Sequence, residues 1–242
     1  MISKFEIGTS GWVYKHWKGV FYPETLSQSN WLGFYSQRFD TVEINSSFYR
    51  QPTEQTVKKW SNQVENNDFC FAVKINKYIT HLKKLDVTKD ELLSHLSPYY
   101  YFGNNLGPIL IQLPPFLEAN SETIIRFLAL LPSGYQFAIE PRNESWFSPD
   151  IISKLSRYNV ALVLADSAKY PVKIEKTADF GYVRFHGSKF GESLYSEQEL
   201  EKWAINLRKM AKNLKKVYIY FNNDSAGNAI KNALELKQML RK

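Results

Sequence analysis

Thr41-Val42-Glu43-Ile44-Asn45 is a segment in which apolar and polar side chains alternate. Successive side chains of a β-strand point to opposite faces, so the alternation predicts a strand with Val42 and Ile44 on one face and Glu43 and Asn45 on the other. One face of this strand is apolar, and the other ends in polar groups.

Eight strand-like runs of this kind follow one another along the chain. They are residues 5–8, 41–45, 69–75, 109–113, 136–140, 160–166, 181–186 and 217–222. Short β-rich runs that alternate with helical patterns are typical of parallel sheets with crossover helices. Eight of them in 242 residues predict an α/β fold, a single (β/α)8 TIM barrel domain over residues 1–242, because that fold needs roughly 250 residues.

The stretches between the runs differ in how clearly they predict helices. After Ser196, apolar residues recur at intervals of three and four, which predicts an amphipathic helix that packs against the barrel: Leu200, Trp203, Leu207, Met210 and Leu214. Residues 167–180, between strands 6 and 7, contain Pro171 and little helical periodicity. We expect only a rudimentary helix there.

The alternation divides the strand side chains into two sets. One set is apolar and should face the helices: Val42, Ile44, Phe71, Val73, Ile75, Ile109, Ile111, Ile139, Val163, Val183, Phe185, Ile219 and Phe221. The other set should face the barrel interior and ends, at the carboxyl side, in Gly8, Ser10, Glu43, Asn45, Lys74, Asn76, Gln112, Glu140, Arg142, Asp166, Arg184, His186, Asn222 and Asp224. Each of these residues alone could be a cap or a structural ion pair. Barrels of this kind place ligand chemistry at the carboxyl ends of their strands, so the polar ring is the predicted site.

The composition is that of a folded chain, with 44% hydrophobic, 15% aromatic and 23% charged residues. We find no apolar run of about 18 residues and no signal peptide pattern, and we therefore expect a cytoplasmic protein without a membrane partner. Cys70 lies alone in an apolar run, which favours a buried structural thiol. The net charge of +7 comes from residues 202–242, where ten Lys and Arg stand against two acidic residues. A Lys-rich terminal helix is usually a solvated face.

The strand ends also resemble those of the YecE-like family, a domain of unknown function (number seventy-two). The matching segments are Gly8-Thr9-Ser10-Gly11-Trp12, Val42-Glu43-Ile44-Asn45 with Ser47-Phe48-Tyr49-Arg50, Phe71-Ala72-Val73-Lys74 with Ile79-Thr80-His81, Gln112-Leu113-Pro114-Pro115, Glu140-Pro141-Arg142 with Ser145-Trp146-Phe147, Asp166, Arg184-Phe185-His186-Gly187 and Tyr220-Phe221-Asn222-Asn223-Asp224. The resemblance implies a TIM-type barrel and no established activity. Likeness of the family to sugar isomerases and endonuclease IV is an analogy of fold. Asn143 stands where the family often has His.

Acid–base chemistry on a small polar or anionic ligand, such as a sugar or sugar phosphate, is the first hypothesis. Glu43, Glu140, Asp166 and His186 are the candidate catalytic residues, because carboxylates and imidazole exchange protons near neutral pH. The candidate ligand-binding residues are Ser10, Trp12, Asn45, Tyr49, Arg50, Lys74, His81, Gln112, Arg142, Trp146, Arg184, Asn222 and Asp224. Arginine among them favours carboxylate or phosphate recognition.

Two alternatives concern a metal ion and nucleic acid. A divalent metal ion could be held by Glu43, Glu140, Asp166 and His186, although no local motif points to one, and we assign no metal ligands. Nucleic-acid binding would use the basic carboxyl-terminal third and the aromatic residues of the first loop, which could instead pack as a lid over the barrel.

The barrel could also bind a ligand without catalysis. The sequence contains no nucleotide-binding motif such as a Walker loop or Gly-x-Gly-x-x-Gly, so no cofactor is predicted. It gives no prediction of the oligomeric state.

Overall fold

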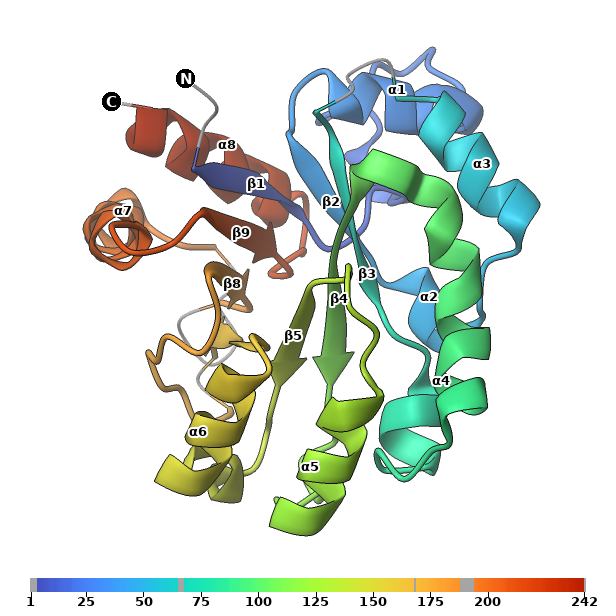
Figure 1. The fold of residues 1–242 in the computed structure, drawn as a ribbon. Coiled ribbons are helices and arrows are strands. Elements are labelled where there is room, and N and C mark those ends of the chain that lie inside the picture. The colour runs from blue at the N-terminus through green and yellow to red at the C-terminus, as the bar shows by residue number, and fades with distance from the viewer. Residues whose placement is uncertain (1–3, 65–67, 168, 188–193, 242) are drawn as a thin grey trace.

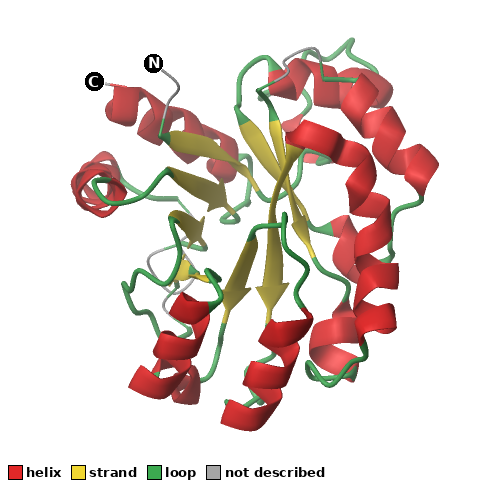
Figure 2. Cartoon of the chain, in the orientation of Figure 1, coloured by secondary structure: helices red, strands yellow, loops and turns green. Residues whose placement is uncertain are grey.

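The computed structural model describes residues 4–64, 68–167, 169–187 and 194–241, and its strands form two parallel sheets with helices on their outer side (Figures 1 and 2). The five-stranded sheet has the order β2 (Thr41–Ile44), β3 (Cys70–Lys74), β4 (Leu106–Gln112), β5 (Phe137–Glu140) and β6 (Ala161–Leu162). The four-stranded sheet has the order β1 (Phe5–Thr9), β9 (Lys216–Phe221), β8 (Phe180–Phe185) and β7 (Leu164–Asp166). The predicted α/β fold with parallel strands is confirmed.

The helices of the described residues stand between the strands in the chain. They are α1 (Trp31–Ser36), α2 (Ser46–Tyr49), α3 (Glu54–Asn62), α4 (Lys89–Leu96), α5 (Ser121–Leu130), α6 (Pro149–Arg157), α7 (Glu197–Ala211) and α8 (Asn228–Arg241), with 3₁₀ turns at Lys15–Trp17, Gln28–Asn30, Ser97–Asn105 and Glu144–Phe147 and a π-helical turn at Tyr78–Leu82. The predicted helix after Ser196 is α7, and Ser196 caps it by accepting from the N–H of Glu199. Among the described residues, no helix combines the length and apolar character needed to cross a bilayer.

The two sheets do not join into a closed eight-stranded barrel, which corrects the prediction of one continuous sheet. Between β1 and β2, the Tyr35 hydroxyl accepts a hydrogen bond from the N–H of Thr9 (2.8 Å) and donates one to the carbonyl oxygen of Thr41 (3.2 Å). A side chain thus takes backbone groups that would otherwise pair across the two strands. The strands are nevertheless close, because a Cβ atom on Gly8 would lie 1.9 Å from the carbonyl oxygen of Thr41.

The second interruption divides the sixth predicted strand. β6 pairs with β5 and β7 pairs with β8, and Val163 stands between them. The hydroxyl of Thr177 accepts from the N–H of Leu162 (2.7 Å) and donates to the carbonyl oxygen of Val160 (2.7 Å). Thr177 therefore satisfies backbone groups at the start of the strand, and pairing with β8 begins only at Leu164.

The segment between β7 and β8 contains no helix in its described part, residues 167 and 169–179, so the expectation of a rudimentary helix is wrong there. Residue 168 lies outside the described residues. A cavity of about 410 Å³ occupies this part of the fold, lined by Leu162, Leu164 and Phe180 from the strands and by Met210 from α7. A short irregular segment covers the strands here less completely than a helix would.

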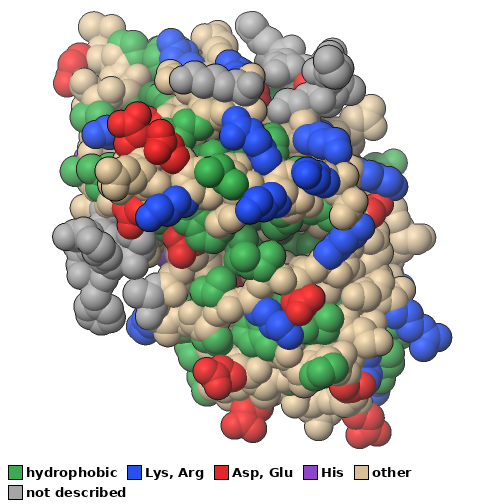
Figure 3. All heavy atoms as spheres, turned by 90° about the vertical axis from the view of Figure 1, so that its left-hand side faces the viewer, with side chains coloured by type: hydrophobic (Ala, Val, Ile, Leu, Met, Phe, Trp, Pro, Cys, Tyr) green, Lys and Arg blue, Asp and Glu red, His purple; other side chains and the backbone are tan. Residues whose placement is uncertain are grey.

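The side of the molecule with α7 carries basic side chains. Lys202, Arg208 and Lys209 of α7 are exposed. Figure 3 shows Lys and Arg side chains in a row across this side, next to hydrophobic side chains. The basic residues of α7 therefore lie at the surface, as predicted for a solvated helix face.

Two hydrophobic clusters bear out the predicted division of strand side chains for most residues. The larger cluster joins the helices to outward-facing strand residues such as Val42, Val73 and Ile111. The smaller cluster lies between the two sheets and consists of Cys70, Ala72, Leu110, Ala138, Ala161, Val163, Ala165, Ala178, Phe180, Tyr182, Tyr218 and Tyr220. Cys70 is the predicted buried thiol, and burial raises its pKa to about 12.

The prediction is wrong for the sixth strand, where Val163 faces the interior and not the helices. Leu162 and Leu164 belong to the helix-facing cluster, and Asp166 shares their parity. With Val163 assigned to the helix-facing set, alternation predicts that Asp166 faces inward. Its carboxylate instead accepts a hydrogen bond from the hydroxyl of Tyr195 (2.7 Å), a residue of the outer cluster.

Candidate functional site

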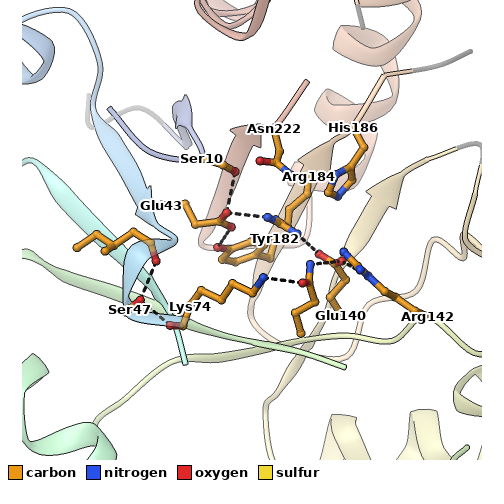
Figure 4. A network of polar contacts seen from close by, with 12 residues as sticks. Ser10, Glu43, Ser47, Lys74, Glu140, Arg142, Tyr182, Arg184, His186 and Asn222 are labelled. Atoms are coloured by element: carbon orange, nitrogen blue, oxygen red, sulfur yellow. Dashed lines mark hydrogen bonds and ion pairs between the residues drawn. The ribbon is translucent and has the colours of Figure 1, made fainter. Parts of the chain in front are cut away.

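Arg184 lies at the centre of a buried polar network (Figure 4). Its side chain, on β8, is 1% exposed. Nη2 donates to Oε1 of Glu43 on β2 (2.8 Å), and Nη1 donates to Oε2 of Glu140 on β5 (2.5 Å). Because a buried charge is costly unless it is paired, one guanidinium between two carboxylates is a favourable arrangement. β8 belongs to one sheet and β2 and β5 to the other, so this network joins the two sheets.

The Glu43 carboxylate accepts three hydrogen bonds from protein side chains. Oε1 accepts from the hydroxyl of Ser10 (2.7 Å) as well as from Arg184, and Oε2 accepts from the hydroxyl of Tyr182 (2.6 Å). The side chain is fully buried. Glu43 therefore serves to orient Arg184, since its oxygen atoms already have protein partners.

The Glu140 carboxylate connects the network to two further cations. Its Oε1 accepts from Nε2 of Gln112 (2.7 Å) and from Nε of Arg142 (3.3 Å). The Gln112 amide oxygen in turn accepts from Nζ of Lys74 (2.6 Å). Arg142 also lies against Tyr170, with its guanidinium carbon 4.4 Å from the ring centre. Lys74 and Arg142 are half-buried, so the outer part of the network is accessible.

Two buried nitrogen atoms of this network have no partner among the described residues: Nε of Arg184 and Nε2 of His186. His186 follows β8 two residues after Arg184 and therefore shares its face. The amide nitrogen of Asn222 lies 3.2 Å from Nδ1 of His186 and can only donate, which makes Nδ1 the acceptor. A neutral His186 ring then carries its proton on Nε2. Both unpartnered atoms are therefore N–H donors.

The surroundings shift the pKa values of three groups. Burial alone would raise the pKa of Glu140, but the charge of Arg184 and the neighbouring basic side chains hold that pKa at about 2. Burial, with the charge of Arg184, lowers the pKa of Lys74 to about 8 and that of His186 to about 4. His186 is thus neutral at pH 7, and Lys74 is easier to deprotonate than an ordinary lysine.

The charges of the network do not cancel. Lys74, Arg142 and Arg184 are three cations, Glu43 and Glu140 are two carboxylates, and the difference is one positive charge. Together with two N–H groups that lack acceptors, this surplus favours a ligand with a negative charge and acceptor oxygens.

Comparisons with known proteins place the chain in a family. The family model described as "Protein of unknown function DUF72" matches residues 6–242. The chain belongs to the DUF72 family. It is 27% identical to UPF0759 protein YunF of Bacillus subtilis (strain 168), with 97% of this chain and 94% of YunF aligned.

Solved structures of DUF72 proteins have the same fold. A DUF72 family protein from Thermotoga maritima MSB8 is similar with a TM-score of 0.85 and 27% identity, covering 99% of this chain and all of that one. A second, from Enterococcus faecalis V583, has a TM-score of 0.80 and 20% identity, covering 98% of this chain and 96% of that one. Neither description names an activity or a ligand.

The four residues considered for a divalent metal ion do not come together in this DUF72 chain. Arg184 lies between Glu43 and Glu140, and Asp166 points toward the outer cluster. Burial raises the pKa of Asp166. The described residues contain no group of three or more His, Cys, Asp and Glu side chains that could hold a metal ion. These four residues therefore do not fit a metal site.

The first loop of this DUF72 chain is bound to the loop after β9 through Asp224. The Asp224 carboxylate contacts Nε2 of His16 (2.7 Å) and accepts from Nε1 of Trp17 (3.0 Å). Trp17 and Tyr22 are buried, and Trp12 is buried edge-on against Trp60. These three aromatic side chains are packed, as the lid hypothesis expects.

The remaining predicted residues lie at different depths. Trp146 is buried and donates to the carbonyl oxygen of Leu117. Tyr49 and Arg50 are exposed, and Asn45 is half-buried with no partner for Oδ1 among the described residues. His81 packs edge-on against Phe48, and burial lowers its pKa. None of them has a direct contact with Arg184, Glu43 or Glu140 within the described network.

Sequence reasoning missed Tyr182 and Tyr170. The strand pattern could have revealed Tyr182, because it stands two residues before Arg184 on the same face of β8. Tyr170 lies in the irregular segment before β8, and no periodic signal identified it. Its contact with Arg142 depends on how that segment folds.

Proposed function

We propose that this protein binds a small anionic, polar molecule, such as a sugar phosphate, at the Arg184 network and carries out acid–base chemistry on it. The observation that supports this most is the pair of unpartnered buried donors, Nε–H of Arg184 and Nε2–H of His186, beside a surplus positive charge. Buried donors are rarely left without an acceptor, and a ligand oxygen would supply one.

The residues divide into supporting and reacting groups. Glu43 and Glu140 hold Arg184 in place, because they accept four hydrogen bonds from other side chains besides the two from Arg184 itself. Arg142, half-buried at the edge, binds the charged group of the ligand. The neutral ring of His186 donates a hydrogen bond from Nε2 to a carbonyl or hydroxyl oxygen and stabilises the negative charge that develops on it.

We also propose that the two sheets are the halves of a TIM-type barrel. An isolated bridge between Ser10 and Glu43 connects the end of β1 to β2, and the chain runs directly from β6 to β7 through Val163. The strands then follow one another around a ring, which places the carboxyl ends of β2, β5 and β8 around one axis.

Calorimetric titration with inorganic phosphate, glycerol 3-phosphate and uncharged glycerol tests the proposed ligand class. We expect the two anions to bind and glycerol not to bind. Arg142→Met should weaken binding of glycerol 3-phosphate at least tenfold, because a direct charge contact is lost. Arg126→Met is the matched control, since Arg126 is exposed and pairs only loosely with Asp86 (3.8 Å). Absence of anion binding, or equal loss in both variants, contradicts the proposal.

A further inference from the structure

Lys74 is a cation of the network without a carboxylate of its own. None of the ion pairs formed by the described residues includes it, because Glu43 and Glu140 are taken by the two arginines. Nζ donates to the neutral amide oxygen of Gln112 (2.6 Å) and lies 4.0 Å from the centre of the Phe48 ring. A half-buried ammonium held by an amide and a ring is less well stabilised than one paired with a carboxylate.

The neighbours of Lys74 favour the neutral amine. Burial disfavours the charged form most, the positive charge of Arg184 acts in the same direction, and the carboxylates of Glu43 and Glu140 oppose both. The resulting pKa of about 8 leaves a minor fraction of free amine at pH 7, far more than an ordinary lysine has. A lysine that is desolvated and next to another cation is an activated nucleophile toward carbonyl carbon.

The position of Lys74 suits attack on a bound ligand. It is the last residue of β3, its side chain points into the network, and it remains partly accessible (Figure 4). Nε2–H of His186 and Nε–H of Arg184 belong to the same network and are buried without an acceptor among the described residues. The partly exposed guanidinium of Arg142, beside Glu140, could bind a charged group of the same molecule.

We propose that Lys74 forms an imine with the carbonyl carbon of a small anionic aldehyde or ketone. This inference rests on the proposed function, because it takes the anion site as the place where the carbonyl compound binds. The lone pair of Nζ attacks the carbonyl carbon, and the C–O double bond opens. The nitrogen then loses two protons, which the oxygen takes up, and the oxygen leaves as water. No oxidant or reductant is needed. The imine makes the neighbouring C–H bond more acidic, which is the chemistry that an isomerase or an aldol-type enzyme requires.

Reductive trapping tests the inference on the intact protein. The protein is incubated with sodium cyanoborohydride in three separate reactions, which contain dihydroxyacetone phosphate, pyruvate or uncharged acetone. Peptide mass spectrometry then locates the adducts. We expect Lys74 to be modified by at least one of the two anionic carbonyl compounds, at least tenfold more than exposed Lys77, which serves as a control within the same chain. Acetone should show no such preference. Equal labelling of the two lysines, or no adduct on Lys74, overturns the inference.

Competition separates this inference from the proposed function. Glycerol 3-phosphate has no carbonyl group, so it should bind and suppress labelling of Lys74 without forming an adduct. If glycerol 3-phosphate binds but Lys74 is not labelled, the imine is wrong and the anion site stands. If glycerol 3-phosphate does not bind and Lys74 is not labelled, both the proposed anion site and the imine at Lys74 are wrong. Because labelling of Lys74 and Lys77 is compared within the same wild-type protein, the test needs no variant of Lys74.

Discussion

Arg184 shows how one residue can hold a fold and a site together. Its guanidinium bridges Glu43 and Glu140, which belong to the other sheet, and leaves Nε–H without a partner in the described residues. The two carboxylates fix the plane of the guanidinium, so the free N–H points in a defined direction. Rigid positioning of a donor is what ligand recognition requires.

Replacement of Arg184 by Met should destabilise the protein strongly. Methionine replaces only the aliphatic part of the side chain, so it leaves buried Glu43 without a cation and Glu140 with Arg142 alone, and breaking a buried ion pair in this way costs about 3–5 kcal/mol. Urea unfolding followed by circular dichroism measures the effect. The exposed counterpart Arg126→Met should change the free energy of unfolding by less than about 0.5 kcal/mol. Similar stability of both variants would show that the network does not hold the two sheets.

At the level of the elements, the contact between β1 and β2 depends on a side chain. The Tyr35 hydroxyl is fully buried and joins the backbone of Thr9 to that of Thr41. β1 and β2 are too close for a Cβ atom at Gly8, yet they do not form a regular ladder. The tyrosine thus replaces part of the strand pairing that would close a barrel.

Tyr35→Phe should lower the free energy of unfolding by about 1–3 kcal/mol, because it leaves a buried N–H and a buried C=O without their partner. Chemical denaturation provides the measurement. Tyr100→Phe is the matched control, since Tyr100 is 73% exposed and its hydroxyl is hydrated in any case. If Tyr35→Phe proves as stable as the control, the backbone groups of Thr9 and Thr41 pair in another way.

In the whole molecule, Asp224 connects the beginning of the chain to its end. Its carboxylate contacts His16 and Trp17, more than two hundred residues earlier in the sequence. Tyr14 in the same loop donates to the carbonyl oxygen of Ser10, and burial with the charges of Asp224 and Glu43 raises its pKa to about 12. The loop is therefore tied both to the last strand and to the Arg184 network.

Asp224→Asn should loosen the first loop without unfolding the protein. The amide keeps the size of the carboxylate but loses its charge and one acceptor oxygen, so the contacts to His16 and Trp17 weaken. Hydrogen exchange measured by mass spectrometry should become faster in residues 11–22 and stay unchanged in β3 and β4. Asp179→Asn is the control variant, because the carboxylate of Asp179 pairs with Lys215 and not with the first loop. Unchanged exchange in the first loop would mean that hydrophobic packing alone holds it.

The sequence alone determined where the strands lie and which polar residues end them, because alternation of side chains is a local property of extended backbone. It identified Glu43, Lys74, Glu140, Arg142, Arg184 and His186 as one set. The prediction is wrong for the sixth strand, where alternation places Asp166 inward, whereas its carboxylate accepts a hydrogen bond from Tyr195. Local alternation cannot show that a strand is interrupted by a distant hydroxyl such as that of Thr177.

Only the tertiary structure decided what these residues do to one another. Arg184 meets Glu43 and Glu140 because two sheets face each other, and the distance between partners in the sequence exceeds forty residues. Among the described residues, the same packing leaves Lys74 without a carboxylate and two N–H groups without an acceptor. Charge and hydrogen-bonding capacity are properties of single residues, but pairing depends on which neighbours the fold brings within about 3 Å.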